Sequence, residues 1–297
     1  MNTADKNLQK HLELRRKTLK AIGLTTGLAG IGIPLLSLTG CGADLAEEDE
    51  TEGDDTTTND GSTSVEKTVA WAAGTTDLIT VDYPDDSLFE AASVCTLALT
   101  GTTTEGPCYF AVDELEDISE GLAGLPMQLC LQVIDEACDP LEGVVVEVWH
   151  CDTGGVYSAD TSGSDDSSRF AGNFCTGGDS SANTSKWYRG ELTTDSSGRV
   201  NFKTCFPGWY SGRTIHIHFR VRNGSYDSVI SQFCFDDEFC EEICTTHSEY
   251  SARGSQDTSL SSGRDTVFGS DYGDYQMNLA QNSDGTLLAY KVIQVSS

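Results

Sequence analysis

The sequence has few basic residues and few prolines. Its 297 residues include 18 Lys and Arg against 47 Asp and Glu, which gives a formal net charge of −29, and only 6 prolines. Binding to nucleic acid needs clustered Lys and Arg that neutralise phosphates, and the chain has no long basic run. An anionic membrane surface would also repel so acidic a protein. We therefore exclude nucleic acid and purely electrostatic membrane binding.

Strong helical periodicity and internal repeats are also missing. Hydrophobic residues, with glycine not counted, make up 38% of the chain. They occur in short stretches between polar turns, which favours an all-β fold, either a sandwich or a barrel. The predicted strands are 129–134, 143–149, 190–194, 200–204, 214–221, 229–235 and 287–295.

Turns, one helix and two long loops complete this picture. The turn Asp195-Ser196-Ser197-Gly198 predicts a hairpin between the strands on either side of it. A short helix is expected at 238–244. The Gly-, Ser-, Asp- and Thr-rich segments 153–185 and 246–275 are long loops, and loops of this length in a compact β domain are usually functional or disordered.

The first forty residues have the layout of an export signal. Residues 14–20 are basic and include the pair Arg15-Arg16, and a mildly apolar, Gly-rich stretch follows from 21 to 38. The paired arginines resemble a twin-arginine signal. A transmembrane anchor is the alternative, but about 18 residues that include four glycines and a proline make a poor spanning helix.

Leu38-Thr39-Gly40-Cys41 resembles a bacterial lipobox, so we expect Cys41 to carry lipid. The protein would then be exported to the periplasm or the cell surface, with a lipid as its one membrane contact. Removal of residues 1–40 takes away six basic and two acidic residues and changes the net charge from −29 to −33. The acidic segment 41–67 has little to bury and is predicted to be a disordered tether, with one folded domain at 68–297.

Ten cysteines remain once Cys41 is assigned to lipid. An even number in an exported chain suggests up to five disulfides. A metal site formed by Cys240, Cys244 and His247 is the alternative, although the spacing fits no zinc template well. The ten are Cys95, Cys108, Cys130, Cys138, Cys151, Cys175, Cys205, Cys234, Cys240 and Cys244.

Two of the five histidines lie two residues apart, at His216 and His218. On a strand, side chains at i and i+2 emerge from the same face, close enough to bind one metal ion. The alternative is a pair of histidines that form hydrogen bonds across strands. The spacing alone is a weak signal for a metal site.

The surroundings of these histidines are more specific. The pattern Pro207-Gly208-x-Tyr210-x-Gly212-Arg213-x-x-His216-x-His218 resembles the intradiol ring-cleavage dioxygenases, among them the protocatechuate and catechol dioxygenases. Further matching blocks follow one another in the family's order from about 102 to the carboxyl end. These blocks are Thr104–Tyr109, Trp149–Tyr157, Arg189-Gly190 before Thr194-Asp195, and Ser231–Phe235.

The resemblance implies a mixed β-sandwich of two sheets, with long loops and few short helices, that holds non-haem Fe(III). Its metal ligands would be Tyr157, Tyr210, His216 and His218. Ferric iron is a hard cation that prefers anionic oxygen, and imidazole also suits iron. Phenolates persist at neutral pH only beside a strong cation, because free Tyr has a pKa of about 10. The alternatives are aromatic packing for Tyr210 and surface exposure for Tyr157.

The resemblance also assigns roles in catalysis. Arg213 would stabilise negative charge on the aromatic substrate, Gln232 would lie near it, and Tyr210 would leave the metal and accept a proton. The alternative for Arg213 is a surface ion pair. Trp149 and Trp209 are expected to pack around the site.

The implied reaction uses O2 to cleave a catechol-type ring to a cis,cis-muconate-type product. A catechol- or iron-binding lipoprotein without turnover is the alternative from another class. A metal-free structural domain is a third possibility. No long helical amino-terminal region of the catechol dioxygenase kind is visible in the sequence, which puts the dimer built from such helices in doubt and leaves the oligomeric state open.

Overall fold

The computed structural model describes residues 65–90, 99–164, 166–269 and 272–296. The predicted signal, Cys41, nearly all of the acidic tether and Cys95 lie outside these ranges. The described residues belong to one compact unit, Asn59–Ser297. No helix within the described ranges is both long and apolar enough to cross a membrane.

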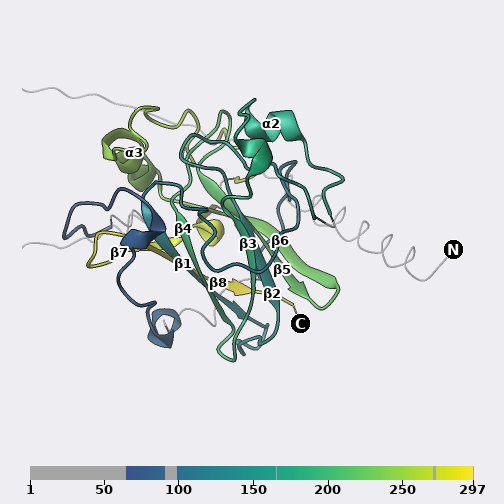
Figure 1. Ribbon diagram of the computed structural model, residues 1–297. Helices are drawn as coiled ribbons and strands as arrows, with labels where there is room; N and C mark the ends of the chain where they lie inside the picture. The colour runs from purple at the N-terminus through teal and green to yellow at the C-terminus, as the bar shows by residue number, and fades with distance from the viewer. Residues whose placement is uncertain (1–64, 91–98, 165, 270–271, 297) are drawn as a thin grey trace, which may run out of the picture. The chain divides into compact units, whose positions relative to one another are not determined.

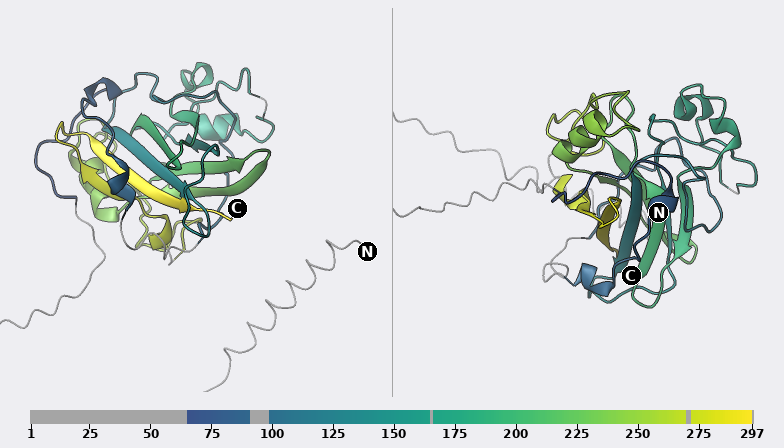
Figure 2. Two further views of the ribbon diagram at one scale, coloured as in Figure 1. Left: turned by 90° about the horizontal axis from the view of Figure 1, so that it is seen from below. Right: turned by 60° about the vertical axis from the view of Figure 1, so that its left-hand side comes forward.

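Eight strands within the described residues form two four-stranded sheets (Figure 1). The first sheet has the order β4-β1-β8-β7 and the second β3-β2-β5-β6. Only β1 and β8 pair in parallel among the described strands, and Figure 2 shows them side by side although they are far apart in the sequence. The strands are β1 Pro126–Ile134, β2 Val145–Trp149, β3 Arg189–Thr193, β4 Arg199–Cys205, β5 His216–Asn223, β6 Tyr226–Cys234, β7 Asn278–Gln281 and β8 Leu287–Gln294.

The predicted mixed β-sandwich is therefore confirmed. The inner faces of both sheets supply one apolar core, in which Leu129 and Leu131 of β1 and Phe219 of β5 are fully buried. Phe219 stacks on Phe233 of the neighbouring strand with 4.0 Å between ring centroids. Because strand side chains alternate, β5 directs its odd-numbered residues into this core and its even-numbered residues to the outer face.

Helices are short and few. The predicted helix near 238–244 is present as α3, Asp237–Thr246, and Asp236 caps it by accepting hydrogen bonds from the backbone N–H groups of Glu238 and Phe239. The remaining elements are α2 Gly172–Thr176 and the 3₁₀ helices Thr76–Leu78, Asp86–Phe89, Ala182–Thr184 and Tyr272–Tyr275.

The hairpin prediction at Asp195–Gly198 is wrong in its pairing. The turn forms, with the Gly198 N–H donating to the Asp195 carbonyl at 2.9 Å. However, β3 pairs with β2 and β4 pairs with β1, so the turn connects the two sheets. The Val133 N–H at the end of β1 donates to the Gly198 carbonyl at 2.8 Å, which ties the turn to the first sheet.

The cysteine predictions are met only in small part. Cys108 and Cys175 form one disulfide, the single one among the described residues. Of the up to five disulfides predicted, the described residues form this one, and six other cysteines are buried without a disulfide partner. These are Cys130, Cys151, Cys205, Cys234, Cys240 and Cys244.

The alternative metal site near α3 is also wrong. His247 uses both ring nitrogens within the protein, since Nε2 lies 2.9 Å from the Ala72 carbonyl and Nδ1 accepts from the Glu249 N–H at 3.2 Å. Across the described ranges no cluster of three or more His, Cys, Asp or Glu side chains is suited to a metal ion.

Candidate active site

The site lies on the outer face of the second sheet, where β5 begins. His216 and His218 both leave this face, and their ring centroids are 4.9 Å apart. Segments that connect the strands cover them so completely that both imidazoles are buried. The shared strand face predicted from their spacing is present.

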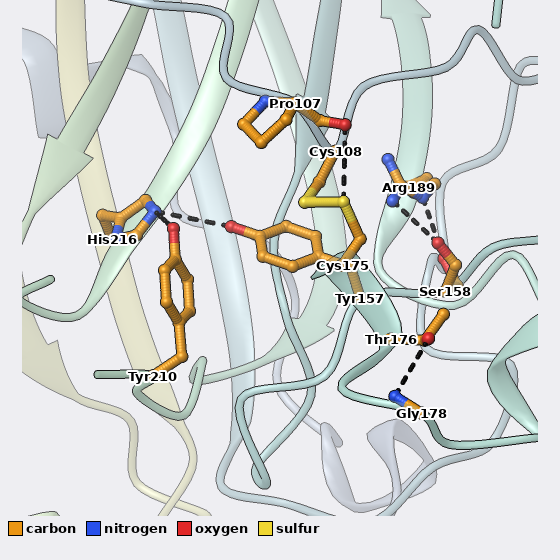
Figure 3. The surroundings of a disulfide bond; sticks show 10 residues. All are labelled: Pro107, Cys108, Tyr157, Ser158, Cys175, Thr176, Gly178, Arg189, Tyr210 and His216. Atoms are coloured by element: carbon orange, nitrogen blue, oxygen red, sulfur yellow. Dashed lines mark hydrogen bonds between the residues drawn. A yellow bond between two sulfur atoms is a disulfide. The ribbon is translucent and has the colours of Figure 1, made fainter. Parts of the chain in front are cut away.

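Two loops bring Tyr157 and Tyr210 to the same histidine (Figure 3). Tyr157 belongs to the long segment after β2, and Tyr210 to the segment that leads into β5. Their hydroxyl oxygens lie 3.4 Å and 3.1 Å, respectively, from Nε2 of His216. The structure thus brings together all four side chains predicted as metal ligands, with the Tyr157 and His218 ring centroids 6.1 Å apart.

The hydrogen bonds fix the tautomer of His216. Its Nδ1 lies 2.7 Å from the Thr214 carbonyl, which can only accept, so Nδ1 carries the proton and Nε2 has a lone pair. Three potential donors face that one lone pair, namely both phenol hydroxyls and Nη1 of Arg213 at 3.5 Å. A bound cation would satisfy this arrangement better than protons can, because it would take the lone pair and two phenolate oxygens together.

His218 has a different environment. Its ring stacks on Trp149 at 5.0 Å with an interplanar angle of 12°, and its buried Nδ1 has no hydrogen-bond partner among the described residues. Gly106 leaves room for this ring, since a Cβ there would lie 3.2 Å from Cε1 of His218. A buried imidazole with so few polar contacts fits a metal ligand.

Burial keeps all four side chains neutral without a cation. Burial and the neighbouring Tyr210 raise the pKa of Tyr157 well above its usual value, and burial also raises the pKa of Tyr210. Burial and the charge of Arg213 lower the pKa of His216 to about 3, and burial lowers the pKa of His218 as well. Two neutral imidazoles and two phenols that ionise only beside a strong cation form a donor set suited to a hard trivalent metal.

The guanidinium of Arg213 is held by hydrogen bonds to two side chains, Asp265 and Gln232. Its Nε donates to Asp265 at 2.9 Å, and its Nη2 donates to Oε1 of Gln232 at 2.6 Å. Gln232 in turn donates from Nε2 to the Thr104 carbonyl at 2.8 Å. Arg213 does form an ion pair, as the alternative prediction stated, but this pair is largely buried and lies beside His216.

Arg189 supports the opposite side of Tyr157. Its guanidinium donates to the Oγ and the carbonyl of Ser158 at 2.8 Å and 2.9 Å. Its Cζ also lies 4.0 Å from the Phe110 ring centroid and 5.8 Å from that of Tyr157. This buried contact fixes the chain directly after Tyr157.

The disulfide Cys108–Cys175 lies next to Tyr157 (Figure 3). The Tyr157 N–H donates to the Cys175 carbonyl at 2.9 Å, so the disulfide restrains the backbone of a proposed ligand. A cavity of about 410 Å³ opens here, and Tyr157, Tyr210, the disulfide and Phe174 are among the residues that line it. This cavity is large enough for an aromatic ring.

Sequence reasoning missed Asp265 and the pairing of Cys108 with Cys175. Asp265 is one of 47 acidic residues and stands in no motif that the resemblance covers. The tryptophans pack as predicted, because Trp149 stacks on His218 and the Trp209 ring N–H donates to the Gly254 carbonyl at 3.0 Å.

Comparisons with known proteins agree with this geometry. A family model described as "Dioxygenase" matches residues 105–265, more than half of the chain. The structure of an intradiol ring-cleavage dioxygenase from Tetranychus urticae is 26% identical, with a TM-score of 0.55 over 67% of this chain and 94% of that chain. Another solved dioxygenase is 25% identical, with a TM-score of 0.56 and the same coverage.

A relative known from its sequence is chlorocatechol 1,2-dioxygenase from Pseudomonas putida. It is 26% identical over 127 residues, which are 35% of this chain and 42% of the relative. This chain therefore spans less than half the length of that relative.

Proposed function

This chain belongs to the intradiol ring-cleavage dioxygenase family, and from this premise we propose that it uses O2 to open the ring of a catechol-type substrate. The observation that carries the proposal is the approach of the Tyr157 and Tyr210 hydroxyls and of Arg213 to Nε2 of His216. Non-haem Fe(III) held by Tyr157, Tyr210, His216 and His218 would supply Lewis acidity and the redox chemistry with O2.

The two tyrosines have different roles in this proposal. Tyr157 is 2% exposed and is restrained by Cys175 and by the packing of Arg189, so it would stay in place. Tyr210 is less buried and, like Tyr157, lines the cavity. Tyr210 would therefore accept a proton from a catechol hydroxyl, while the nearby guanidinium of Arg213 stabilises the negative charge left on the substrate oxygen.

Gln232 acts as a positioning residue in this scheme. Both of its polar side-chain atoms are already used, because Oε1 accepts from Arg213 and Nε2 donates to Thr104. It would hold the guanidinium at the correct distance from the reacting oxygens.

The proposed reaction balances without any further reductant. The bond between the two hydroxyl-bearing carbons breaks, and both atoms of O2 enter the product. Each of these carbons becomes a carboxyl carbon, so the product is a cis,cis-muconate-type dicarboxylate.

The visible spectrum and O2 uptake together test this function. We expect the Fe(III)-loaded protein to be red to brown from tyrosinate-to-iron charge transfer, and anaerobic addition of catechols to shift the band. Oxygen uptake should follow when air is admitted. A shifted band without O2 consumption across a panel of catechols would instead identify a binding lipoprotein, and a protein that stays colourless after Fe(III) addition would contradict the metal site.

We also propose that the protein is exported by its twin-arginine signal and anchored by lipid on Cys41. The proposal rests on the sequence pattern at residues 14–41. Replacement of Arg15 and Arg16 by Lys should retain the precursor in the cytoplasm, and Cys41→Ser should release exported protein from the membrane fraction. Unchanged fractionation of both variants would refute this localisation.

A further inference from the structure

The cavity beside Tyr157 and Tyr210 contains an arginine to which the proposed ring cleavage gives no role. Arg253 lies in the loop after α3 and lines the same cavity. Its Cζ lies 4.2 Å from the Trp209 ring centroid, and its Nη1 lies 3.0 Å from where a Cβ at Gly155 would be. The guanidinium is thus held between the loops that carry the two tyrosines, although the residue is exposed to solvent.

Arg253 forms no direct ion pair in the described part of the chain, although its charge acts on the carboxyls of Asp152 and Asp257. Five other arginines do form ion pairs, as expected in a protein with a net charge of −29: Arg169, Arg199, Arg213, Arg220 and Arg222. The nearby carboxylates are engaged elsewhere. Asp152 accepts from the backbone of Gly154 and Val156, and Asp257 accepts from Ser211 and Gly212.

Among the described residues that line the cavity, Arg253 is the one cation. Arg213 is already paired with Asp265. The disulfide and Phe174 supply apolar surface, which suits the faces of an aromatic ring. A ring whose hydroxyls are bound near Tyr157 and Tyr210 would share the cavity with this guanidinium, which forms no direct ion pair with a described residue.

We propose that Arg253 binds a carboxylate carried by the catechol ring, so that the preferred substrates are catechol carboxylates. This inference rests on the proposed function. The planar guanidinium can donate two parallel hydrogen bonds to a carboxylate, and stacking on Trp209 orients it before substrate binds. In so acidic a protein a carboxylate substrate would otherwise meet net repulsion.

The test compares matched substrates on the iron-loaded, full-length mature protein. One substrate is 3,4-dihydroxybenzoate, and the other is the neutral 3,4-dihydroxybenzamide of nearly equal size. For each we would measure kcat/KM from O2 uptake and Kd from anaerobic visible titration. The variants are Arg253→Gln and Arg253→Lys. Arg264→Gln is the matched control, because it removes one exposed arginine from the same loop.

We expect the wild-type protein to prefer the benzoate and Arg253→Gln to reduce the benzoate-to-benzamide ratio of kcat/KM about tenfold, as for the loss of a charge-assisted hydrogen bond. Arg253→Lys should keep part of the preference, and Arg264→Gln all of it. Added salt should lower the ratio for the wild type and leave Arg253→Gln unchanged.

The outcomes separate the two proposals. Turnover of both substrates with no benzoate preference, or a preference that Arg253→Gln preserves, would overturn the role of Arg253 and leave the dioxygenase function standing. Absence of O2 uptake with every catechol would overturn the function. In that case a lower benzoate affinity of Arg253→Gln in the anaerobic titration would still support the binding role.

Discussion

Asp265 holds Arg213 in place just before the start of β5, the strand that carries His216 and His218. Its Oδ2 accepts from Nε of Arg213 at 2.9 Å and from the Thr214 N–H at 2.8 Å. Its Oδ1 accepts from the backbone of Val267 and Phe268 at 2.8 Å and 2.9 Å. One carboxylate therefore fixes both its own loop and the guanidinium beside His216, which makes Asp265 a positioning residue for the proposed reaction.

The first prediction concerns Asp265→Asn. The amide keeps the size of the side chain but loses the charge that pairs with Arg213, so the guanidinium should move away from the reacting oxygens. We expect kcat/KM to fall about 10- to 100-fold, in line with the cost of misplacing a catalytic group by about 1 Å. The tyrosinate-to-iron band should remain, because Asp265 touches neither tyrosine.

Asp284→Asn is the control for this experiment. Asp284 also accepts backbone hydrogen bonds, from Thr80, Val81 and Thr286, but it lies outside the site. Loss of activity in both variants would point to general destabilisation. Full activity of Asp265→Asn would show that Asp265 does not position Arg213 for the reaction.

The proposed ligands give a spectroscopic prediction. Tyr157→Phe and His216→Ala should each abolish the visible band of the iron-loaded protein. The first variant removes the Tyr157 hydroxyl oxygen and the second removes Nε2 of His216, and both atoms are proposed metal ligands. Tyr290→Phe, far from the site in the first sheet, should keep the band. Absorption that survives both ligand variants would refute the assignment.

Arg213→Ala separates colour from turnover. Arg213 is not a proposed ligand, so the band should persist. Turnover should fall about 100-fold or more, the usual cost of removing a group that stabilises developing charge. The measurement is O2 uptake and the visible spectrum on the same sample. Unchanged turnover would exclude Arg213 from the reaction.

Local patterns in the sequence predict most of the strands, but they do not predict which strands pair. Alternation along 214–221 predicted β5 and the common face of His216 and His218, because side-chain direction follows directly from the strand period. The turn at Asp195–Gly198 was visible too, yet which partners β3 and β4 take depends on packing far along the chain. The four-residue β7 was missed because it is short and only half buried.

The same limit applies to the site. Tyr157, Tyr210, His216 and His218 could be named because they stand in motifs that resemble a family. The contact of Asp265 with Arg213 spans 52 residues and leaves no local signal. The pairing of Cys108 with Cys175, 67 residues apart, likewise depends on how the segment before β1 meets α2.

The disulfide should stabilise the fold and the site together. Closing a loop of this length restricts the unfolded chain, so reduction should lower the free energy of unfolding by about 2–4 kcal/mol. Urea denaturation with and without dithiothreitol measures this difference. The double variant Cys108→Ser/Cys175→Ser should have the free energy of unfolding of the reduced protein, and dithiothreitol should not change it. Equal stability of the oxidised and reduced wild type would contradict the prediction.

The final prediction concerns Gly155, where the loops of the two tyrosines touch. Gly155 has a φ of +81°, and a Cβ there would collide with the Trp209 carbonyl oxygen. Gly178 has a similar φ of +87°, but a Cβ there would meet nothing within 4 Å. The two positions therefore share the backbone strain and differ in the collision.

We expect Gly178→Ala to cost about 1–2 kcal/mol, the penalty of a left-handed backbone for an L-residue. Gly155→Ala should cost about 1–3 kcal/mol more, because the crowded loops must separate. Since Gly155 and Trp209 lie beside Tyr157 and Tyr210 in the chain, Gly155→Ala should also weaken the visible band, and Gly178→Ala should not. Urea denaturation and the visible spectrum measure the two effects. Equal costs and equal bands would show that the contact between these loops does not position the tyrosines.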